Sequence, residues 1–376
     1  MKNSQPAVIG SDQSHDLKQA RDQNYISLLN KSLRIFFSNA VKISLKNPTL
    51  ALSFLQTMRN QQKASRIRKA HAQTGLHVPP ILIFSVTNRC NLHCHGCYHQ
   101  AIHKAEQPEM SEEKLKEVIS EARDLGISFI VLAGGEPLVR QDILGIIRAF
   151  PDIIFFMFTN GLLITDELVN ELKNLRNLVP ILSIEGYQDE TDVRRGQGVY
   201  ARVQNAMVKL KRYDIFFGVS LTVTSTNFET ITAGNFIQNI ISAGCKMVFT
   251  VEYSPLKEGT EDWVISGDQR EKLAKIIENF RLQNKALFIN LPGDEKDFGG
   301  CLSAGRGFVH INATGDVEPC PFAPYSDINL KEFSLETALK STFLKRIRES
   351  PEVLEEGEGA CALWTKRQWL QSMLKQ

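Results

Sequence analysis

Short apolar runs alternate with amphipathic stretches through the central part of the chain. Runs typical of buried strands lie at residues 81–86, 127–133, 153–158, 179–184, 215–223 and 247–251. Between them, apolar residues recur at helical spacing over residues 111–125, 142–150, 166–175, 200–213 and 229–243. Six such strand and helix units repeat roughly every 25 to 35 residues. This spacing is what right-handed βαβ connections require. The pattern predicts an α/β fold, a partial (β/α)6 barrel of the TIM type, over residues 77–290.

Residues 1–76 form a different, basic region, for which we expect a helical arm. Residues 1–75 contain twelve Lys or Arg and three Asp, which is a strong excess of positive charge. The whole chain has a net charge of only +2. One interpretation is that these helices pack on the main domain with a solvated basic face. The alternatives are peripheral contact with a membrane through an interfacial helix, or docking of an anionic partner. Nucleic acid is not expected as a partner, because no aromatic residues are interleaved with the charges.

No apolar run in the sequence reaches the length that a bilayer span needs. The amino terminus also lacks the apolar core of a secretion signal. We therefore expect a cytoplasmic protein. Peripheral attachment to a membrane through the arm is the alternative.

Three of the seven cysteines, Cys90, Cys94 and Cys97, follow the first predicted strand as C-x3-C-x2-C. Loops at the carboxyl ends of barrel strands carry the ligand chemistry of such folds. Three thiolates can hold three corners of a four-iron cluster and leave the fourth iron open. A structural zinc site completed by a nearby histidine is the alternative, although such sites usually pair two C-x2-C units. A disulfide framework is disfavoured, because an odd number of thiols in a long chain fits a reducing compartment.

The segment TNRCNLHCHGCY, residues 87–98, resembles the signature of the radical S-adenosylmethionine (SAM) superfamily. The resemblance implies that a [4Fe–4S] cluster binds SAM at its open iron and cleaves it reductively. The resulting 5′-deoxyadenosyl radical then takes a hydrogen atom from the substrate. It also implies an external one-electron reductant of the flavodoxin or ferredoxin type. The family often has an aromatic residue before the third cysteine, where this chain has Gly96, with Tyr98 just after it.

Further elements at the predicted strand ends resemble SAM-binding motifs of this family. The turn after the second strand resembles the Gly-Gly-Glu-Pro motif that lines the SAM amino group, and an ordinary tight turn is the alternative. Ser183 and Glu185 resemble a pair that faces the ribose, and strand alternation puts both on one face. Arg195 resembles an arginine that meets the SAM carboxylate, a pairing for which a guanidinium is suited. The expected SAM-binding residues are Tyr98, Gly134, Gly135, Glu136, Pro137, Ser183, Glu185 and Arg195.

Residues 291–376 are rich in glycine and carry Cys301, Cys320 and Cys361. Gly315-Asp316 predicts a hairpin turn between residues 308–311 and 317–318, in a small α+β extension. The sequences around the three cysteines resemble the auxiliary-cluster extension of SPASM and twitch radical SAM enzymes. The resemblance implies a second [4Fe–4S] cluster, with an open iron or a non-cysteine fourth ligand. Each thiol taken singly could instead be a buried small hydrophobe, which is how we interpret Cys245.

The sequence thus favours a radical SAM enzyme whose catalytic residues beyond the cluster are not assigned. Peptide or protein modification is the first expectation for its substrate, since SPASM relatives often do this. A lipid or isoprenoid substrate comes second because of the basic arm, and a cyclic pyranopterin synthase-like reaction is a further alternative. The rival from another class is a non-catalytic metal-binding scaffold.

Overall fold

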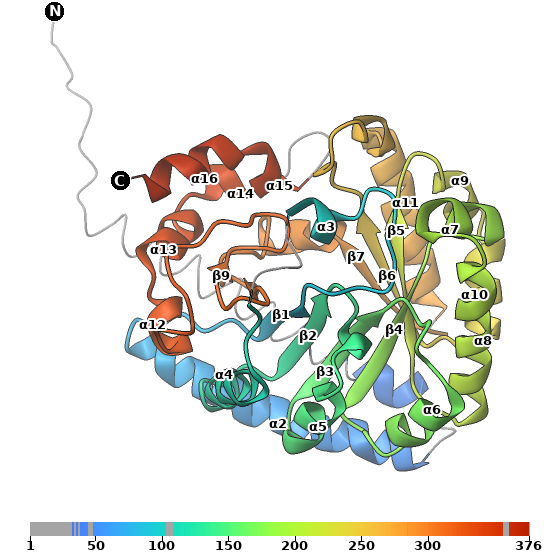
Figure 1. Cartoon of the computed structure of the whole chain (residues 1–376), viewed down its shortest axis with the longest axis horizontal. Coiled ribbons are helices and arrows are strands. Elements are labelled where there is room, and N and C mark those ends of the chain that lie inside the picture. Colours follow the sequence, from blue (N-terminus) through green and yellow to red (C-terminus); the bar gives the residue numbers. More distant parts are fainter. Residues whose placement is uncertain are drawn as a thin grey trace, which may run out of the picture.

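A nine-stranded, mostly parallel sheet organises the chain (Figure 1). The computed structural model describes residues 32–33, 35–36, 38–43, 48–102, 108–283, 285–355 and 361–375. The strands are β1 (Ile81–Thr87), β2 (Phe129–Gly134), β3 (Ile154–Thr159), β4 (Leu178–Ile184), β5 (Gly218–Val223), β6 (Met247–Glu252), β7 (Leu287–Leu291), β8 (Phe308–Ile311) and β9 (Val317–Glu318). Their order in the sheet is β7-β6-β5-β4-β3-β2-β1-β8-β9.

The first seven strands are parallel and follow one another in sequence order, as βαβ repetition requires. The predicted α/β partial barrel is therefore confirmed. Two features extend it: β7 lengthens one edge, and β8 pairs in parallel with β1 at the other edge. β9 then returns antiparallel to β8, so the predicted hairpin has its expected strands. The predicted boundary between residues 290 and 291 falls inside β7, and the division into three regions stays a prediction.

Helices surround the outer face of the sheet (Figure 1). They are α4 (Glu112–Asp124), α5 (Ile143–Ala149), α6 (Asp166–Leu172), α7 (Gln188–Arg195), α8 (Val199–Arg212), α9 (Phe228–Thr232), α10 (Asn235–Ser242) and α11 (Gly267–Leu282). α4 begins where predicted, because the Ser111 side chain accepts a hydrogen bond from the Lys114 backbone N–H. The helix expected over residues 229–243 is instead two helices. Gly234 separates them with a φ of +83°, a conformation that a helix interior does not allow.

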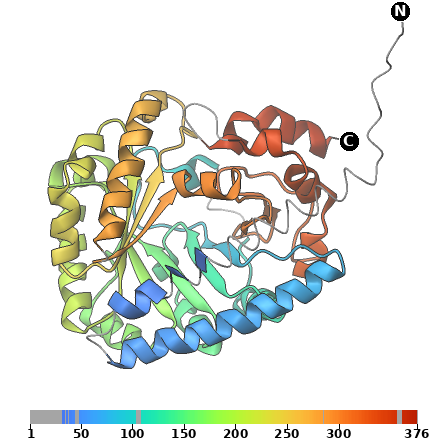
Figure 2. The ribbon, with the colours of Figure 1, turned by 180° about the vertical axis from the view of Figure 1, so that it is seen from behind.

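The amino-terminal arm closes the end of the barrel opposite the cysteine rim. α2 (Pro48–Gln73) runs along the amino-terminal ends of the strands, with the helical part of residues 32–43 beside it (Figure 2). Phe36, Ala40 and Phe54 join the apolar cluster on the inner face of the sheet. The Phe54 ring lies 5.1 Å from that of Phe216, just before β5. The arm is thus a floor of the barrel; residues 1–31 lie outside the described part of the chain.

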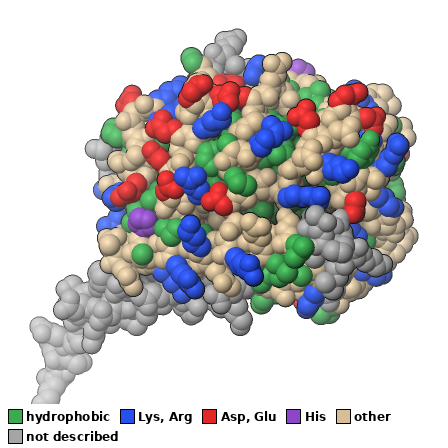
Figure 3. Space-filling model, turned by 90° about the horizontal axis from the view of Figure 1, so that it is seen from below, with side chains coloured by type: hydrophobic (Ala, Val, Ile, Leu, Met, Phe, Trp, Pro, Cys, Tyr) green, Lys and Arg blue, Asp and Glu red, His purple; other side chains and the backbone are tan. Residues whose placement is uncertain are grey.

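One of the basic residues of the arm takes part in packing instead of facing solvent. The Arg68 side chain is buried and donates to the Gly126 carbonyl oxygen at 2.5 Å, and burial lowers its pKa to about 10. Figure 3 shows the underside of the molecule, where Lys and Arg are spread over the whole face and Asp and Glu lie mainly in the upper half of the view. In the described residues, no helix combines the length and apolar composition of a membrane span. These observations favour the interpretation that the arm packs on the main domain.

The carboxyl-terminal region lies against the rim of the barrel. It contains α12 (Leu335–Leu339), α13 (Thr342–Arg348), α14 (Pro351–Leu354), α15 (Ala362–Thr365) and α16 (Arg367–Leu374). A buried hydrogen-bond chain fastens its hairpin to β1. His310 Nε2 lies 2.8 Å from Ser85 Oγ, and His310 Nδ1 lies 2.7 Å from Glu318 Oε2. Because all three side chains are buried, this chain fixes β8 and β9 beside the strand that leads into the cysteine loop.

Candidate functional site: a cavity between two groups of cysteines

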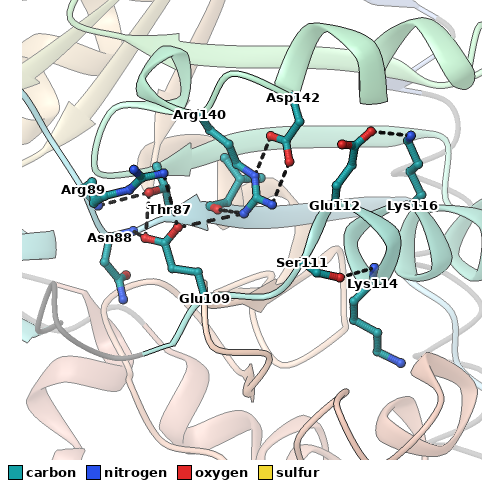
Figure 4. A network of polar contacts seen from close by, with 11 residues as sticks. Thr87, Asn88, Arg89, Glu109, Ser111, Glu112, Lys114, Lys116, Arg140 and Asp142 are labelled. Atoms are coloured by element: carbon teal, nitrogen blue, oxygen red, sulfur yellow. Dashed lines mark hydrogen bonds and ion pairs between the residues drawn. The ribbon is translucent and has the colours of Figure 1, made fainter.

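The loop with Cys90, Cys94 and Cys97 is anchored where it leaves β1 (Figure 4). Glu109 Oε1 accepts hydrogen bonds of 2.8 Å from the Asn88 backbone N–H and from the Thr87 hydroxyl. Arg140 donates to the Val86 carbonyl oxygen at 3.0 Å and forms a two-point ion pair with Asp142. Arg140 Nη1 also lies 4.0 Å from Glu109. Sequence reasoning missed Glu109 and Arg140, because neither belongs to a motif and their contacts form only in the fold.

The Gly134-Gly135 turn packs directly on this loop. The Gly135 N–H donates to the Thr87 carbonyl oxygen at 2.8 Å, and the Glu136 N–H donates to that of Arg89 at 2.9 Å. A Cβ on Gly135 would stand 2.1 Å from the Arg89 carbonyl oxygen, and one on Gly134 would stand 2.4 Å from that of Thr87. No side chain fits at either position, so the glycine pair allows β2 to hold the cysteine loop in place.

The Glu136 carboxylate connects the β2 and β3 loops. It is buried and accepts from the Thr159 hydroxyl at 2.8 Å, the Asn160 backbone N–H at 2.7 Å and the Leu138 N–H at 3.1 Å. Burial raises its pKa, although these donors oppose the shift. Pro137 begins the short 3₁₀ helix η1 (Pro137–Val139) and is buried, so it shapes the turn from behind.

Arg194 and Arg195 converge on Glu185 at the end of β4. Arg195 Nε lies 2.7 Å and Arg194 Nη1 2.5 Å from the same carboxylate oxygen, Glu185 Oε1. Glu185 is 1% exposed, whereas Ser183 is half-buried and faces the cavity. The expected pair is therefore divided: Ser183 lines the cavity, and Glu185 lies behind the two arginines. Both guanidinium groups line the cavity, where they place positive charge beside the cysteine loop.

Aromatic side chains from elsewhere fill the space at Gly96. A Cβ there would stand 2.6 Å from the Tyr253 hydroxyl and 2.9 Å from the Trp263 ring, and Gly96 has a φ of +65°. Tyr253 follows β6, and its ring also faces the Arg194 guanidinium at 5.9 Å. The family motif often has an aromatic residue at the position of Gly96. In this chain the Tyr253 and Trp263 side chains occupy that space, which explains the glycine. Tyr98 instead begins α3 (Tyr98–Ile102) and packs edge-on against Phe322 at 5.1 Å.

The three carboxyl-terminal cysteines come from separate segments that fold onto one another. The Cys301 N–H donates to the Leu354 carbonyl oxygen at 2.9 Å, and Arg306 Nη1 donates to the Cys301 carbonyl oxygen at 2.5 Å. Cys320 follows β9, and Cys361 precedes α15, which lies beside α3 in both ribbon views (Figures 1 and 2). Cys245 belongs to neither group. It is fully buried in the core, and its thiol donates a hydrogen bond to the Met247 carbonyl oxygen at 3.0 Å.

All six expected ligand cysteines line one cavity of about 740 Å³. Of the expected SAM-binding residues, those that line it are Tyr98, Gly134, Gly135, Glu136, Ser183 and Arg195. Glu185 and Pro137 stand behind this wall. The structure therefore brings together on one surface most of the residues that the sequence singled out from segments more than two hundred positions apart.

Burial makes the thiols weak acids in the absence of metal. It raises the pKa of Cys90 to about 11 and raises that of Cys94, where Arg195 opposes the shift. Burial, then Glu295 and Cys361, raise the pKa of Cys301, while contact with Cys361 and then burial raise that of Cys320. Thiols of this kind become ligands only when a metal replaces their protons.

The arrangement fits iron–sulfur clusters better than single metal ions. Among the described residues, no three His, Cys, Asp or Glu side chains gather as one metal ion would require. In a four-iron cluster each thiolate binds a different iron, so the ligands surround a larger body. Three cysteines on a loop held by backbone contacts, beside two arginines, suit such a cluster and an anionic ligand next to it.

The chain is similar in sequence to proteins of known families. Residues 84–232 match the model described as Radical SAM superfamily. The AdoMet-dependent heme synthase of Methanosarcina barkeri is 26% identical over 76% of this chain and 89% of its own length. The mycofactocin maturase MftC of Mycobacterium tuberculosis is 27% identical over 67% of this chain and 66% of its own length.

Solved structures share the fold. Streptococcus suis SuiB bound to its precursor peptide SuiA superposes with a TM-score of 0.63 at 17% identity, over 79% of this chain and 72% of SuiB. The enzyme anSMEcpe with bound AdoMet and a Cp18Cys peptide superposes with a TM-score of 0.59 at 18% identity, over 74% of this chain and 84% of the other.

Proposed function

We propose that this chain is a radical SAM enzyme, which cleaves SAM reductively and abstracts hydrogen from a substrate, because residues 84–232 match the Radical SAM superfamily model. The observation that carries the proposal is the shared cavity, in which Cys90, Cys94 and Cys97 face Ser183 and Arg195. When bound, the [4Fe–4S] cluster and SAM supply an electron and the 5′-deoxyadenosyl radical. An external flavodoxin or ferredoxin type protein is the proposed source of that electron.

The chain's own residues orient SAM in this proposal. Arg195 lies on the cavity wall beside Cys94, where its charge opposes the rise in the pKa of that thiol caused by burial. Its guanidinium is suited to pair with the SAM carboxylate. Glu185 keeps the guanidinium in place from behind at 2.7 Å. Ser183 offers a hydroxyl to the ribose from β4. Glu136 also lines the cavity, and the three hydrogen bonds that its carboxylate accepts hold the turn in the shape proposed to bind SAM.

A second cluster held by Cys301, Cys320 and Cys361 is part of the proposal. Its support is that the three thiols line the same cavity as the first group and influence one another's pKa. A cluster there would face a substrate between the two cysteine groups. The two relatives are named for different products, one as a heme synthase and the other as a mycofactocin maturase. The structural neighbour SuiB is bound to a precursor peptide. Peptide or protein modification stays the first proposal, with a lipid or isoprenoid substrate second.

Anaerobic reconstitution tests the proposed function. Protein with iron and acid-labile sulfide, given SAM and dithionite, should release 5′-deoxyadenosine. The matched control is Cys245→Ala, which removes a cysteine that lies outside the cavity. Sulfide-containing protein that yields no 5′-deoxyadenosine would identify an iron–sulfur scaffold, and zinc without sulfide would restore the zinc alternative.

A further inference from the structure

The cavity extends far below the cysteine rim, into the interior of the barrel. Besides the cysteines it is lined by Phe36 and Asn39 of the arm, at the opposite end of the strands. Ile81, at the start of β1, also lines it, and β1 leads up from there to the cysteine loop. By the usual rise of a strand, the stretch from Ile81 to Ser85 is about 13 Å long. The site therefore has a deep lower part that the binding of SAM at the rim does not account for.

The wall of this lower part is apolar. Inward-facing positions pair across neighbouring strands, Ile83 with Val131 and Val131 with Phe156. We call these positions the lower lumen: Ile81, Ile83, Phe129, Val131, Phe156 and Phe249. Toward the carboxyl ends, the lining positions of β4 and β5 become hydroxylic, with Ser183, Ser220 and Thr222. Along the strands the lining thus changes from hydrocarbon side chains to hydroxyl groups, while Ser32 and Asn39 are polar lining residues of the arm at the floor.

Several of these apolar side chains are not closed off by protein. Ile81, Ile83 and Val131 are only half-buried, although they point into the barrel. The phenylalanines beside them are fixed by one another, with Phe129 stacked on Phe156 at 6.2 Å and Phe156 edge-on to Phe249 at 6.3 Å. Protein interiors are normally filled to crystal-like density, and an accessible apolar cavity favours an apolar ligand over water. The wall is firm and hydrophobic, which is typical of ligand pockets.

Apart from Glu136, Arg194 and Arg195 near the cysteine loop, the charged residues of the lining come from β6, α11 and the segment after β7, and none is among the lower-lumen positions. Arg281 of α11 and Asp294, in the 3₁₀ segment after β7, pair with each other at 2.6 Å. Glu252, at the end of β6, pairs with Arg270 at 2.7 Å. These groups are neutralised within the protein, so they do not call for a charged ligand in the interior.

We propose that the lower lumen binds a hydrocarbon portion of the substrate, so that a more polar part of the same molecule is presented between the two cysteine groups. This proposal rests on the proposed function and favours the second of its substrate classes, a lipid or isoprenoid, because it requires a molecule with an extended aliphatic chain. Residues of the arm form the floor of the lumen, where the aliphatic part of the substrate ends. The order of lining residues sets the orientation, since hydrocarbon is favoured below and hydrogen-bonding groups above.

The test is binding of dodecanol to the full-length, reconstituted protein, measured by displacement of cis-parinaric alcohol fluorescence. Wild type should bind dodecanol saturably at one site. Val131→Phe, which fills the lumen, should weaken binding by at least about tenfold. Val131→Thr keeps the volume and adds a hydroxyl, and should weaken binding by a similar factor without the risk of overpacking. Val208→Phe, on the solvent face of α8 where Val208 is 64% exposed, adds the same bulk and should change nothing.

Absence of saturable binding to wild type would overturn the proposal, as would equal binding by wild type and both Val131 variants. Thermal unfolding of each variant shows whether it remains folded. Cleavage of SAM is measured on the same samples without dodecanol. Dodecanol binding with no 5′-deoxyadenosine would refute the proposed function and leave the lumen assignment standing, whereas cleavage without dodecanol binding would refute the lumen assignment alone.

Discussion

The two groups of cysteines reach the same cavity by different routes. Cys90, Cys94 and Cys97 lie within eight residues on one loop, which β1, β2 and Glu109 fix through backbone contacts. Cys301, Cys320 and Cys361 come from three segments spread over sixty residues and meet only when the region after β7 is folded. The first group is thus a local feature of the barrel, while the second depends on long-range packing. The two should respond differently to mutation and to pH.

The largest difference should come from removing one ligand of each group. Cys94→Ala should lower SAM cleavage by more than about a hundredfold, since loss of even an outer-shell partner commonly costs up to that much. The assay is 5′-deoxyadenosine formed with dithionite as reductant. Activity near that of wild type in Cys94→Ala would remove this cysteine from the site.

Cys361→Ala should act on the second group alone. Iron and sulfide per chain should fall by about half, because one of two four-iron clusters is lost. Uncoupled SAM cleavage should persist, since the loop of the first group is held by other contacts. Elemental analysis and the cleavage assay on the same sample check both points. Equal iron in wild type and this variant would refute the second cluster.

A smaller effect is expected from the anchor of the first loop. Glu109→Gln keeps the shape of the side chain but weakens its hydrogen bonds to Asn88 and Thr87, so SAM cleavage should fall by about tenfold. Glu117→Gln is the matched control, because in the described part of the chain the exposed Glu117 is paired with Lys114 alone, on the surface of α4. If the two variants behave alike, Glu109 does not position the loop.

The smallest effect is a pH dependence of stability that arises at a histidine beside the second group. His77 Nε2 lies 3.2 Å from the Arg306 carbonyl oxygen, and Arg306 in turn holds Cys301. Burial, followed by Arg348, lowers the pKa of His77 to about 4 from 6.5. A histidine kept neutral by folding contributes stability above the pKa of the unfolded chain, and that stability is lost as the pH falls from about 6.5 toward 4.

For this half-buried ring we expect a loss of about 2 kcal/mol in the free energy of unfolding across that range, less than the full pKa shift would give. His77→Gln should flatten this part of the pH profile, which denaturant titrations at several pH values would show. An unchanged slope in the variant would mean that other groups cause the loss.

The same contrast explains what the sequence could reveal. Short apolar runs and helical patterns predicted six strands and most helices, and a compact cysteine motif predicted the first group, because each depends on neighbouring residues. The hairpin around Gly315 was predicted for the same reason. The split between α9 and α10, the withdrawal of Glu185 behind two arginines, and the filling of the space at Gly96 by Tyr253 depend on contacts between distant segments. The arm as the floor of the barrel is another such contact.

The central claim is that the cluster held by Cys90, Cys94 and Cys97 has an open iron that binds SAM. The most direct measurement is electron–nuclear double resonance of the reduced protein with SAM labelled by magnetic isotopes in its amino and carboxylate groups, using Cys361→Ala so that only the first cluster contributes. The account predicts couplings from both groups to the cluster. Spectra without such couplings, in protein that holds the cluster, would contradict it.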